Sequence, residues 1–446
     1  MHLALEFGMV MFALIKGTRP ANQLLTLVAL LLIPALLWPD LDAWIVPVAV
    51  ASGVLGLDLV WCWTVDPPEV QRHIAPNIPV NRESTVRIRL HNRTSQTLRF
   101  EVYDEVPDDC RVAGMPRTLR LPGGASAEVA YSLTVTRRGD ARLGRIICLL
   151  RSPFGFWQRK VSLGESHSVR VYPDFSVISN YLELVSDQHS IRMGIKLMQR
   201  RGEGLEFQQL REYREGDTIR QIDWKATARR QALISREYQE ERDQRVLFLI
   251  DSGRRMRTRD GVLSHFDHAL NGMLLLAYVA LRQGDSVALK LFGAERKWVP
   301  AQRGVGSVNL LLNEVYDLHT GTEAADYISA AEDVMVRQRK RSLIVLMTNL
   351  REEDADLLPA LKLLRQRHVV ILANLRESVL DATAQQMPTG FEEALRVAGT
   401  FHHLAQRQQY QKQCLPLAHM VLDCTPHELP VRVVNAYWQI KRSGKL

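Results

Sequence analysis

Two hydrophobic runs near the N-terminus constrain the fold most, because each is close to the length that a membrane-spanning helix needs. Residues 21–38 read ANQLLTLVALLLIPALLW and residues 41–63 read LDAWIVPVAVASGVLGLDLVWCW. A spanning helix needs about 20 mostly apolar residues. The turn between the runs contains Asp but no Lys or Arg, whereas Lys16 and Arg19 precede the first run and several arginines follow the second, beginning at Arg72. By the positive-inside rule, both flanks are expected in the cytoplasm.

The two runs predict a transmembrane hairpin over residues 21–63, with spans at 21–38 and 41–63. Residues 1–20 hold a shorter apolar stretch that we expect in the membrane interface. A cleaved signal peptide is the alternative for the first run, but a second apolar run follows it at once. Asp58 lies in the second run and could be an intramembrane functional carboxylate, but its carboxylate is expected to reach the headgroups because Trp61 and Trp63 lie close to it. We therefore expect a two-pass protein of the cell (inner) membrane, with both termini and the soluble domains in the cytoplasm.

An alternating pattern follows the second run. Apolar and polar residues alternate in segments such as 86–90, 98–102 and 129–135, which is typical of half-buried strands. Turn-forming residues separate these segments, so residues 68–175 are predicted to form an antiparallel β-sandwich that acts as a spacer or partner contact. The segment SPFGFW at 152–157 places three aromatic residues at a turn, and this composition fits either core packing or a docking site.

The C-terminal part of the chain alternates buried strands with helices. Short apolar runs at 246–250, 343–347 and 369–372 predict strands that are buried on both faces, and 265–282 predicts a long helix. Residues 245–446 are therefore predicted to form a doubly wound α/β domain. Ligands of such domains bind at the carboxyl ends of the strands.

Composition argues against several other classes of protein. The chain has 446 residues, a formal net charge of +8 and a hydrophobic fraction of 46%, which predict several folded units rather than long disorder. The basic residues are interspersed with nearly as many acidic ones and no nucleic-acid motif accompanies them, so no nucleic-acid partner is expected. The five cysteines form no CxxC pair, which indicates neither a zinc site nor a disulfide framework.

A charge-dense signature lies within residues 176–244, which are predicted to be a linker. Residues 204–229 fit the pattern G-x-x-F-x-x-L-R-x-Y-x-x-G-D-x-x-R-x-I-D-W-x-x-x-A-R. In this respect the chain strongly resembles the bacterial domain-of-unknown-function 58 family. The matching residues are Gly204, Phe207, Leu210, Arg211, Tyr213, Gly216, Asp217, Arg220, Ile222, Asp223, Trp224, Ala228 and Arg229.

The resemblance extends to the predicted order of parts: a two-helix anchor, a β-rich segment, the signature and a C-terminal domain similar to von Willebrand factor A. It implies a non-enzymatic adaptor or co-chaperone that works with a MoxR-type AAA+ ATPase and an unidentified protein client. Within the signature, Arg211, Arg220 and Arg229 are interspersed with acidic residues. This arrangement fits either a loop fixed by ion pairs or a partner-binding surface.

A candidate site follows the first strand of the α/β domain. The residues DSGRRM at 251–256 stand where von Willebrand factor A domains carry D-x-S-x-S, the start of a metal-ion-dependent adhesion site. Mg²⁺ requires oxygen ligands in tight octahedral geometry. Gly253 and Arg255 replace the two serines, and Asn349 stands in place of a second Asp, while Thr320 or Thr322 remains as the threonine.

The sequence therefore predicts a degenerate site without a metal or other cofactor, because ligand oxygens are missing and two arginines oppose a cation. Arg255 is expected to occupy the vacant position and pair with Asp251. The site is expected to bind a partner through its arginines. Its residues are Asp251, Ser252, Gly253, Arg254, Arg255, Thr322 and Asn349.

No catalytic residue is predicted. His265 and His268 lie three residues apart on a predicted helix. They could be metal ligands, but surface or capping residues are the favoured interpretation because no further ligand accompanies them. The rival functions are a metal-dependent hydrolase, which needs a catalytic constellation absent from the sequence, and a membrane-bound nucleic-acid-binding protein.

Overall fold

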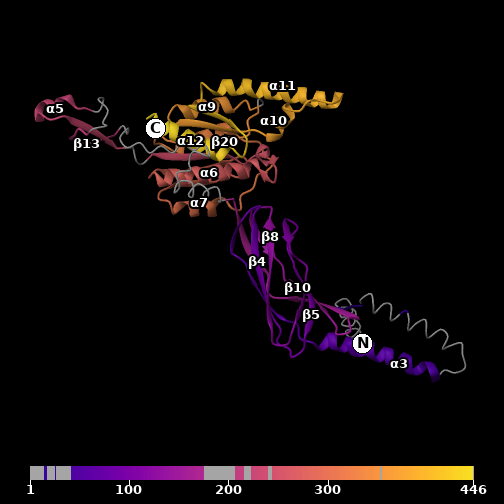
Figure 1. Cartoon of the computed structure of the whole chain (residues 1–446). Coiled ribbons are helices and arrows are strands. Elements are labelled where there is room, and N and C mark those ends of the chain that lie inside the picture. The colour runs from indigo at the N-terminus through magenta and orange to yellow at the C-terminus, as the bar shows by residue number, and fades with distance from the viewer. Residues whose placement is uncertain are drawn as a thin grey trace. The chain divides into compact units, whose positions relative to one another are not determined.

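The computed structural model describes residues 15–17, 26, 42–174, 206–214, 222–239, 244–351 and 354–444. The chain divides into two compact units, Met1–Tyr172 and Pro173–Leu446 (Figure 1). The predicted first span, 21–38, lies outside the described residues except for residue 26, which is helical.

The second apolar run forms the helix α3, Asp42–Thr64. The side chains of α3 are described from residue 48 onward. Judged on the described residues alone, no helix of the chain is long and apolar enough to cross a membrane.

The remainder of the first unit consists of strands, as the alternating pattern predicts. They are β1 (Ile15–Gly17), β2 (Glu69–His73), β3 (Asn77–Pro79), β4 (Glu83–His91), β5 (Leu98–Asp104), β6 (Cys110–Ala113), β7 (Arg117–Leu121), β8 (Ser126–Val135), β9 (Gly139–Leu143), β10 (Ile146–Arg151), β11 (Trp157–Leu163) and β12 (His167–Tyr172). They form three sheets in the orders β1-β11-β10-β5-β7, β2-β4-β8-β6 and β3-β12-β9. Every described pair of strands in the unit is antiparallel except β3 with β12, which is parallel. The prediction of a purely antiparallel sandwich misses this short pair.

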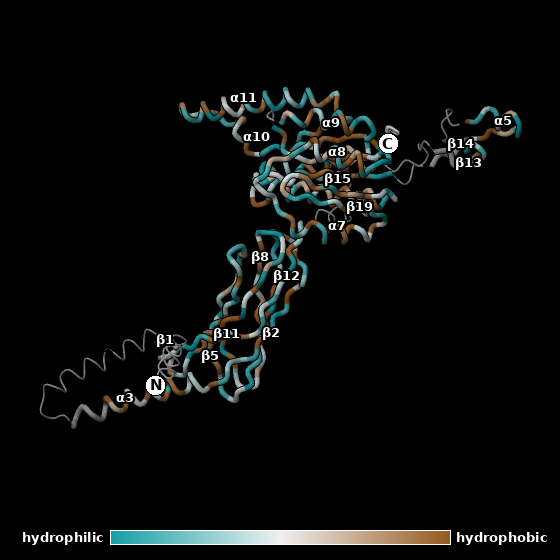
Figure 2. The backbone as a smooth tube through the Cα atoms, turned by 180° about the vertical axis from the view of Figure 1, so that it is seen from behind, coloured by the Kyte–Doolittle hydropathy of each residue, from teal (hydrophilic) through white to brown (hydrophobic). Residues whose placement is uncertain are grey.

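Buried residues alternate with exposed ones along strands of the sandwich such as β4 and β8, and Figure 2 colours the same strands by hydropathy. In β4, Val86, Ile88 and Leu90 are buried, whereas the intervening Arg87 and Arg89 are exposed. Each fully buried side chain of this size stabilises the fold by roughly 1.5–3 kcal/mol. The alternation in the sequence therefore reports correctly which face of each strand meets the core.

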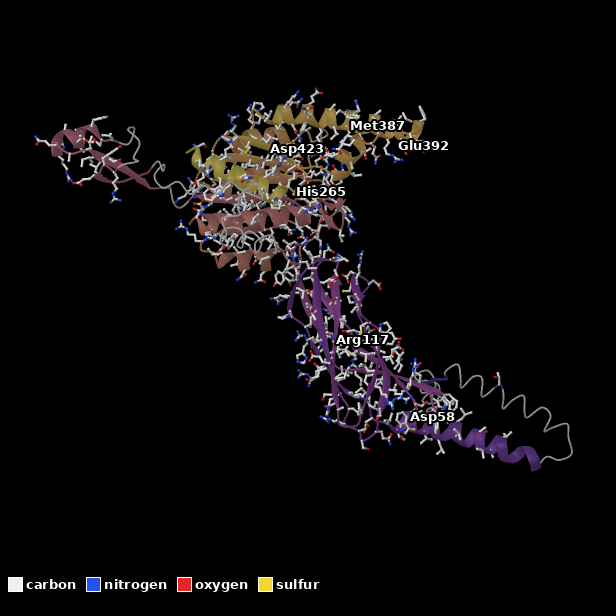
Figure 3. All side chains as sticks on the ribbon, in the orientation of Figure 1. Asp58, Arg117, His265, Met387, Glu392 and Asp423 are labelled. Carbon is white, nitrogen blue, oxygen red and sulfur yellow. The ribbon has the colours of Figure 1, made fainter. Side chains whose placement is uncertain are left out.

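The carboxylate of Asp58, on α3, does not reach outward as predicted. Asp58 is buried where α3 meets the sandwich (Figure 3). Its oxygens accept hydrogen bonds from the Ser152 hydroxyl at 2.5 Å, the Phe154 amide at 3.2 Å and the Phe156 amide at 3.3 Å. The prediction was wrong because the donors lie in a turn more than ninety residues away, which no pattern local to the helix reveals. The segment 152–157 is thus the turn that binds α3 through Asp58.

A six-stranded sheet organises the second unit. Its strands are β15 (Arg245–Asp251), β18 (Ser286–Phe292), β19 (Trp298–Gln302), β20 (Leu343–Thr348), β21 (Val369–Leu375) and β22 (Met420–Cys424), and their order is β19-β18-β15-β20-β21-β22. All neighbours are parallel except β18 and β19. The strands β20 and β21 are buried at every position, as expected for a sheet covered on both faces.

Helices cover both faces of this sheet. They are α6 (His265–Arg282), α7 (Ser307–Val315), α8 (Tyr327–Arg337), α9 (Leu357–Arg365), α10 (Ser378–Ala384), α11 (Phe391–Cys414) and α12 (Leu429–Arg442). One core contains residues of α6, α7 and α12, and a second core on the other face contains residues of α8, α9 and the end of α11. The unit is therefore a mixed α/β sheet domain, as predicted at this level.

The helix α6 has the predicted bounds because a capping box begins it. The Ser264 hydroxyl accepts a hydrogen bond from the Asp267 amide at 3.2 Å, and the Asp267 carboxylate accepts one from the Ser264 amide at 2.9 Å. His265 and His268 are both buried, so the expectation of surface residues was wrong. The helix turns them inward at the edge of the sheet, where His268 packs edge-on against His427.

Candidate partner-binding sites

The first candidate site lies at the carboxyl edge of the six-stranded sheet. After β15 the chain crosses to β18 on one side, and it later returns to form β20 on the other side of β15. Such a change of direction leaves a crevice beyond the ends of the two strands. Asp251 is the last residue of β15, so the buried strand delivers its carboxylate to this crevice.

Asp251 is held in one orientation by two donors. One carboxylate oxygen accepts from the Gly253 amide at 2.7 Å, and the other accepts from the Thr348 hydroxyl at 2.8 Å. Burial raises the pKa of Asp251 to about 6, although both hydrogen bonds act in the opposite direction. Thr348 is bonded in turn to the Tyr327 hydroxyl at 2.8 Å. The threonine that contacts the acid is therefore Thr348, and Thr322 is an exposed residue that does not line the pocket.

Gly253 and Arg255 occupy the two positions where a metal-binding domain of this kind would carry serines. A Cβ on Gly253 would lie 2.9 Å from the Glu323 carbonyl oxygen and 3.0 Å from an Asp251 oxygen. The neighbouring loop approaches this closely because the Arg254 amide donates to the same Glu323 oxygen at 2.9 Å. Only glycine fits here without displacement. The preceding Ser252 is turned away, since its hydroxyl donates to the Phe292 carbonyl at 2.8 Å.

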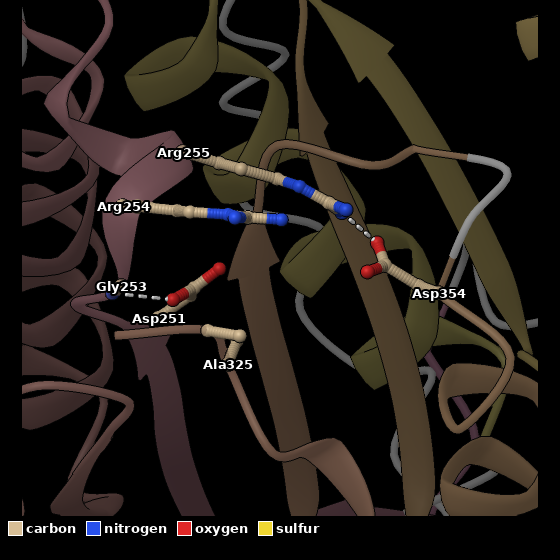
Figure 4. A pocket seen from close by; sticks show the side chains of 7 residues that line it. Asp251, Gly253, Arg254, Arg255, Ala325 and Asp354 are labelled. Atoms are coloured by element: carbon tan, nitrogen blue, oxygen red, sulfur yellow. Dashed lines mark hydrogen bonds and ion pairs between the residues drawn. The ribbon is translucent and has the colours of Figure 1, made fainter. Parts of the chain in front are cut away.

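Two arginines and a second acid complete the pocket (Figure 4). Arg254 and Arg255 belong to the short helix η3, Arg254–Arg257, and extend beside the Asp251 carboxylate. The predicted partner of Arg255 was Asp251, but its guanidinium forms an ion pair with Asp354. The pocket residues are Asp251, Gly253, Arg254, Arg255, Ala324, Ala325 and Asp354.

Asp354 was missed because it lies in the loop beyond β20, in a stretch of several acids without a motif. Burial raises its pKa, while Arg255 lowers it. Within the described part of the chain, no group of three or more His, Cys, Asp or Glu side chains is arranged to hold a metal. Chemically, the pocket offers two carboxylates already engaged by donors and one exposed guanidinium, that of Arg254.

Asn349 does not enter this pocket. It is buried, and its amide nitrogen donates to Glu377 at 2.9 Å and lies 3.3 Å from His265. Its oxygen lies 3.4 Å from an Arg407 nitrogen. The residue therefore belongs to a second polar cluster, at the carboxyl ends of β20, β21 and β22.

Arg407, on α11, is the centre of that cluster. Its guanidinium donates to the carbonyl oxygens of Leu350 at 2.9 Å and Leu375 at 2.5 Å, and to Asp423 at 3.3 Å. These contacts join three strand ends to one helix. Sequence reasoning missed Arg407 because its partners are spread widely along the chain and the helix carries no distinctive motif.

The signature segment forms a small module of its own. It consists of β13 (Glu206–Glu212), α5 (Trp224–Arg230) and β14 (Ile234–Gln239), with β13 and β14 antiparallel. The Asp223 carboxylate accepts from the Ala226 amide at 3.0 Å and so caps α5. The fold of this segment is thus strand, helix and strand, whereas the sequence predicted a linker.

The apolar residues of the signature are partly exposed. Trp224 is 63% exposed, and Leu210 and Leu233 are also exposed. Arg229 is exposed and Tyr213 is half-buried. Gly204, Gly216, Asp217 and Arg220 lie outside the described residues, and only the backbone of Phe207 and Arg211 is described. The predicted ion pairs of this segment therefore stay a prediction.

A further exposed apolar surface, which sequence reasoning did not single out, lies on α10 and α11. Met387 lies between α10 and α11, and Phe391 is the first residue of α11; Figure 3 labels Met387 near Glu392. The exposed apolar residues of this strip are Val379, Met387, Phe391, Leu395 and Phe401. Exposed apolar side chains of this kind are candidates for a protein contact.

Solved structures resemble parts of the chain weakly. A FixG-related protein from Vibrio parahaemolyticus is 16% identical over 24% of this chain and 98% of its own, with a TM-score of 0.18. Proximal thread matrix protein 1 from the mussel byssus is 10% identical over 44% of this chain and 46% of its own, with a TM-score of 0.29. Alpha-2-macroglobulin from Escherichia coli is 12% identical over 24% of this chain and 7% of its own, with a TM-score of 0.19. Likeness this low carries no argument about function.

No curated protein matches the chain. A family model does match, and it is described as "Protein of unknown function DUF58". The match runs from β13 of the signature module to the end of α11, and therefore includes Trp224, the Asp251 pocket and Arg407. In agreement with the resemblance read from the signature, the chain belongs to the DUF58 family over residues 209–415.

Proposed function

We propose that this chain is a non-enzymatic, membrane-anchored adaptor or co-chaperone that binds a MoxR-type AAA+ ATPase and a protein client. Membership of the DUF58 family supports the class of partner, because the resemblance implies it. The signature module and the α/β domain are the proposed contact regions. The bilayer is the second proposed partner.

The exposure of Trp224 is the single observation that carries the proposal. Tryptophan is enriched among the residues that dominate the energy of protein interfaces. A tryptophan with 63% of its surface exposed leaves much apolar area to bury against a partner. Because Asp223 caps the helix that begins at Trp224, the ring stands on an ordered element. Such pre-organisation lowers the entropic cost of binding.

The carboxyl edge of the six-stranded sheet is the second proposed contact. We propose that this domain is doubly wound and similar to von Willebrand factor A, with a degenerate adhesion site around Asp251. The exposed Arg254 offers a guanidinium to an acidic group of the partner, and no metal is needed for that contact. The apolar strip on α10 and α11 is available for further contact.

The membrane hairpin is supported by where its two flanks attach. Strand β1 pairs with β11, with Lys16 opposite Gln158. The end of α3 is bonded to the same strand, since the Arg159 guanidinium donates to the Trp63 carbonyl at 2.8 Å. The chain between these attachments must leave the sandwich and return to it. Two crossings, at 21–38 and 41–63, satisfy this requirement with both flanks on one side.

Co-purification tests the adaptor function. The full chain, extracted in detergent with nucleotide present, is expected to retain a AAA+ ATPase. Trp224→Ser is expected to weaken that association by about 2 kcal/mol or more, which is the scale of an interface hot spot. Val336→Ser is the matched control, because Val336 is an exposed apolar residue of α8 outside all three proposed contacts.

Three other outcomes would contradict parts of the proposal or favour a rival function. Failure of any ATPase to associate with the unaltered chain would contradict the adaptor proposal. Association that EDTA abolishes in the absence of nucleotide would contradict the metal-free contact. Binding to random DNA with a steep dependence on salt would instead favour the nucleic-acid-binding alternative.

A further inference from the structure

The end of α3 is fixed to one end of the sandwich. Besides the hydrogen bonds to Asp58, the Trp157 indole donates to the Leu55 carbonyl at 3.0 Å. The Arg159 guanidinium donates to carbonyls in and just after the last turn of α3, those of Cys62 at 3.2 Å, Trp63 at 2.8 Å and Val65 at 3.2 Å. If α3 enters a bilayer, this end of the sandwich must therefore lie at the bilayer surface.

A row of cations crosses the sheet at the same end. Arg151 is the last residue of β10 and directly precedes Ser152, which is bonded to Asp58. On the neighbouring strand β5 the residue opposite Arg151 is Arg99, and on β7 the residue opposite Arg99 is Arg120. Paired residues of adjacent strands project from the same face of a sheet. The same register position is Gln158 on β11 and Lys16 on β1.

The three arginines of this row form no ion pair within the described chain. All three are exposed, and no hydrogen bond or ion pair joins Arg99, Arg120 or Arg151 to another described residue. By contrast, Arg87 and Arg89 on another sheet of the unit share Glu128. Like charges placed directly opposite one another destabilise a sheet. An external anion would relieve this repulsion.

Apolar groups are exposed beside the row. Phe154 is 67% exposed at the tip of the turn that holds Asp58, and Leu57 and Val60 are exposed on α3. Aromatic and aliphatic side chains next to cations are typical of surfaces that lie at the headgroup level of an anionic membrane. An acidic protein or a nucleic acid would match the charge but would not account for the apolar groups or for their continuity with α3.

We propose that the row Arg99, Arg120 and Arg151 binds the phosphate groups of anionic lipids, with Phe154 inserted at the interface, and so seats the sandwich on the bilayer. The inference rests on the proposed membrane anchoring and adds to it, because the attachment of α3 would bring the sandwich to the bilayer surface, whereas the arginine row would bind the sandwich to the lipid itself. Each arginine near an anionic surface strengthens binding by a few-fold, so the three together shift the seated-to-free ratio on the order of a hundredfold.

Lipid quenching in nanodiscs tests the proposal with the full chain. A fluorophore is attached through Thr118→Cys, an exposed position two residues before Arg120 on β7. The background carries Cys110→Ser, because the other four native cysteines are buried. A lipid with a quencher on its headgroup is expected to quench the fluorophore strongly when phosphatidylglycerol is present and weakly in zwitterionic lipid. High salt is expected to reduce the quenching.

Matched charge variants decide the role of the row. R99Q/R120Q/R151Q is expected to reduce quenching in anionic nanodiscs to the zwitterionic level. R111Q/R137Q/R142Q removes the same charge from exposed arginines elsewhere in the unit and is expected to leave quenching unchanged. The proposal would be overturned if both variants lost quenching equally or if the first variant lost none. It would also be overturned if the first variant kept its quenching but lost binding to an acidic protein or to random DNA.

Failure of the anchor itself is recognised separately. If carbonate extracts the unaltered chain from membranes, then the proposed hairpin fails. If the chain resists extraction but shows no lipid-dependent quenching, then the proposed hairpin is retained and the proposed contact between the arginine row and lipid is refuted.

Discussion

At the residue scale, the most constrained group of the α/β domain is the carboxylate of Asp251. It is almost fully buried, yet Arg255, a cation of the same pocket, is paired with Asp354. Two neutral donors, the Gly253 amide and the Thr348 hydroxyl, hold its oxygens. A buried acid held mainly by neutral donors costs stability when it is ionised.

This cost predicts a pH dependence of stability. Burial raises the pKa of Asp251 from 3.8 to about 6. The folded state binds this proton more tightly than the unfolded state does. Protonation of Asp251 therefore stabilises the fold fully below the unfolded pKa of 3.8, and this stabilisation is lost as pH rises through the folded pKa of about 6. The loss is about 2–3 kcal/mol. Asp251→Asn should therefore gain stability relative to the unaltered chain between about pH 4 and pH 6, with no further gain above that range.

Urea unfolding of both proteins across this pH range measures the difference. Asp317→Asn is the control, because Asp317 is exposed, and it should show little change. A variant Asp251→Asn that is less stable than the unaltered chain at pH 8 would show that the ionised carboxylate is needed for the fold.

At the element scale, single side chains join segments that are distant in the sequence. Arg407 joins α11 to the ends of three strands, and Asp58 joins α3 to the sandwich. Neither junction was predicted, although the second apolar run and the strands β20 and β21 were. Hydrophobic periodicity indicates which residues enter a core, but a buried charge is explained only by partners that the fold brings to it.

Replacement of Arg407 tests the first junction. Arg407→Met removes the donors of the Leu350 and Leu375 carbonyls and leaves Asp423 partly uncompensated. We expect the α/β domain to lose about 3–5 kcal/mol of stability in urea unfolding, the usual cost of removing one partner of a buried pair. Arg396→Met makes the same change at an exposed position of α11 and should cost about 0.5 kcal/mol or less. Equal effects would contradict the role of Arg407.

Replacement of Asp58 tests the second junction. Asp58→Ala leaves the Ser152 hydroxyl and the amides of Phe154 and Phe156 without their acceptor. We expect a local loss of about 2–4 kcal/mol, seen as faster hydrogen exchange of these two amides. Asp108→Ala, at an exposed position of the same unit, should leave their exchange unchanged. Unaltered exchange in Asp58→Ala would show that the turn does not depend on the helix.

At the scale of the whole molecule, the sequence predicts the order of parts better than their sites. The alternation at 86–90 and the apolar runs at 343–347 and 369–372 identify β4, β20 and β21 because each depends only on local burial. The adhesion-site comparison identifies Asp251 but selects Asn349, which lies in the neighbouring cluster. Asp354 and Arg407 escape prediction because a loop and a helix surface carry no periodic signal.

The attachment of both flanks to β11, together with the positive residues in those flanks, predicts the sidedness of the hairpin. A cysteine introduced by Asp40→Cys, in the turn between the proposed spans, should react in intact cells with a reagent that cannot cross the inner membrane. Asp66→Cys, two residues beyond α3, should react only after the membrane is opened. Reaction of both positions in intact cells would contradict the predicted sidedness.

The attachment of α3 to β11 also has a mechanical consequence. A helix joined only through a flexible link would swivel, and a pull at Tyr172, where the first unit ends, would merely reorient the sandwich. Because Asp58, Trp157 and Arg159 bind the helix at several points, the sandwich and α3 behave as a rigid lever. A force applied at Tyr172 would then be delivered to the helix as a torque.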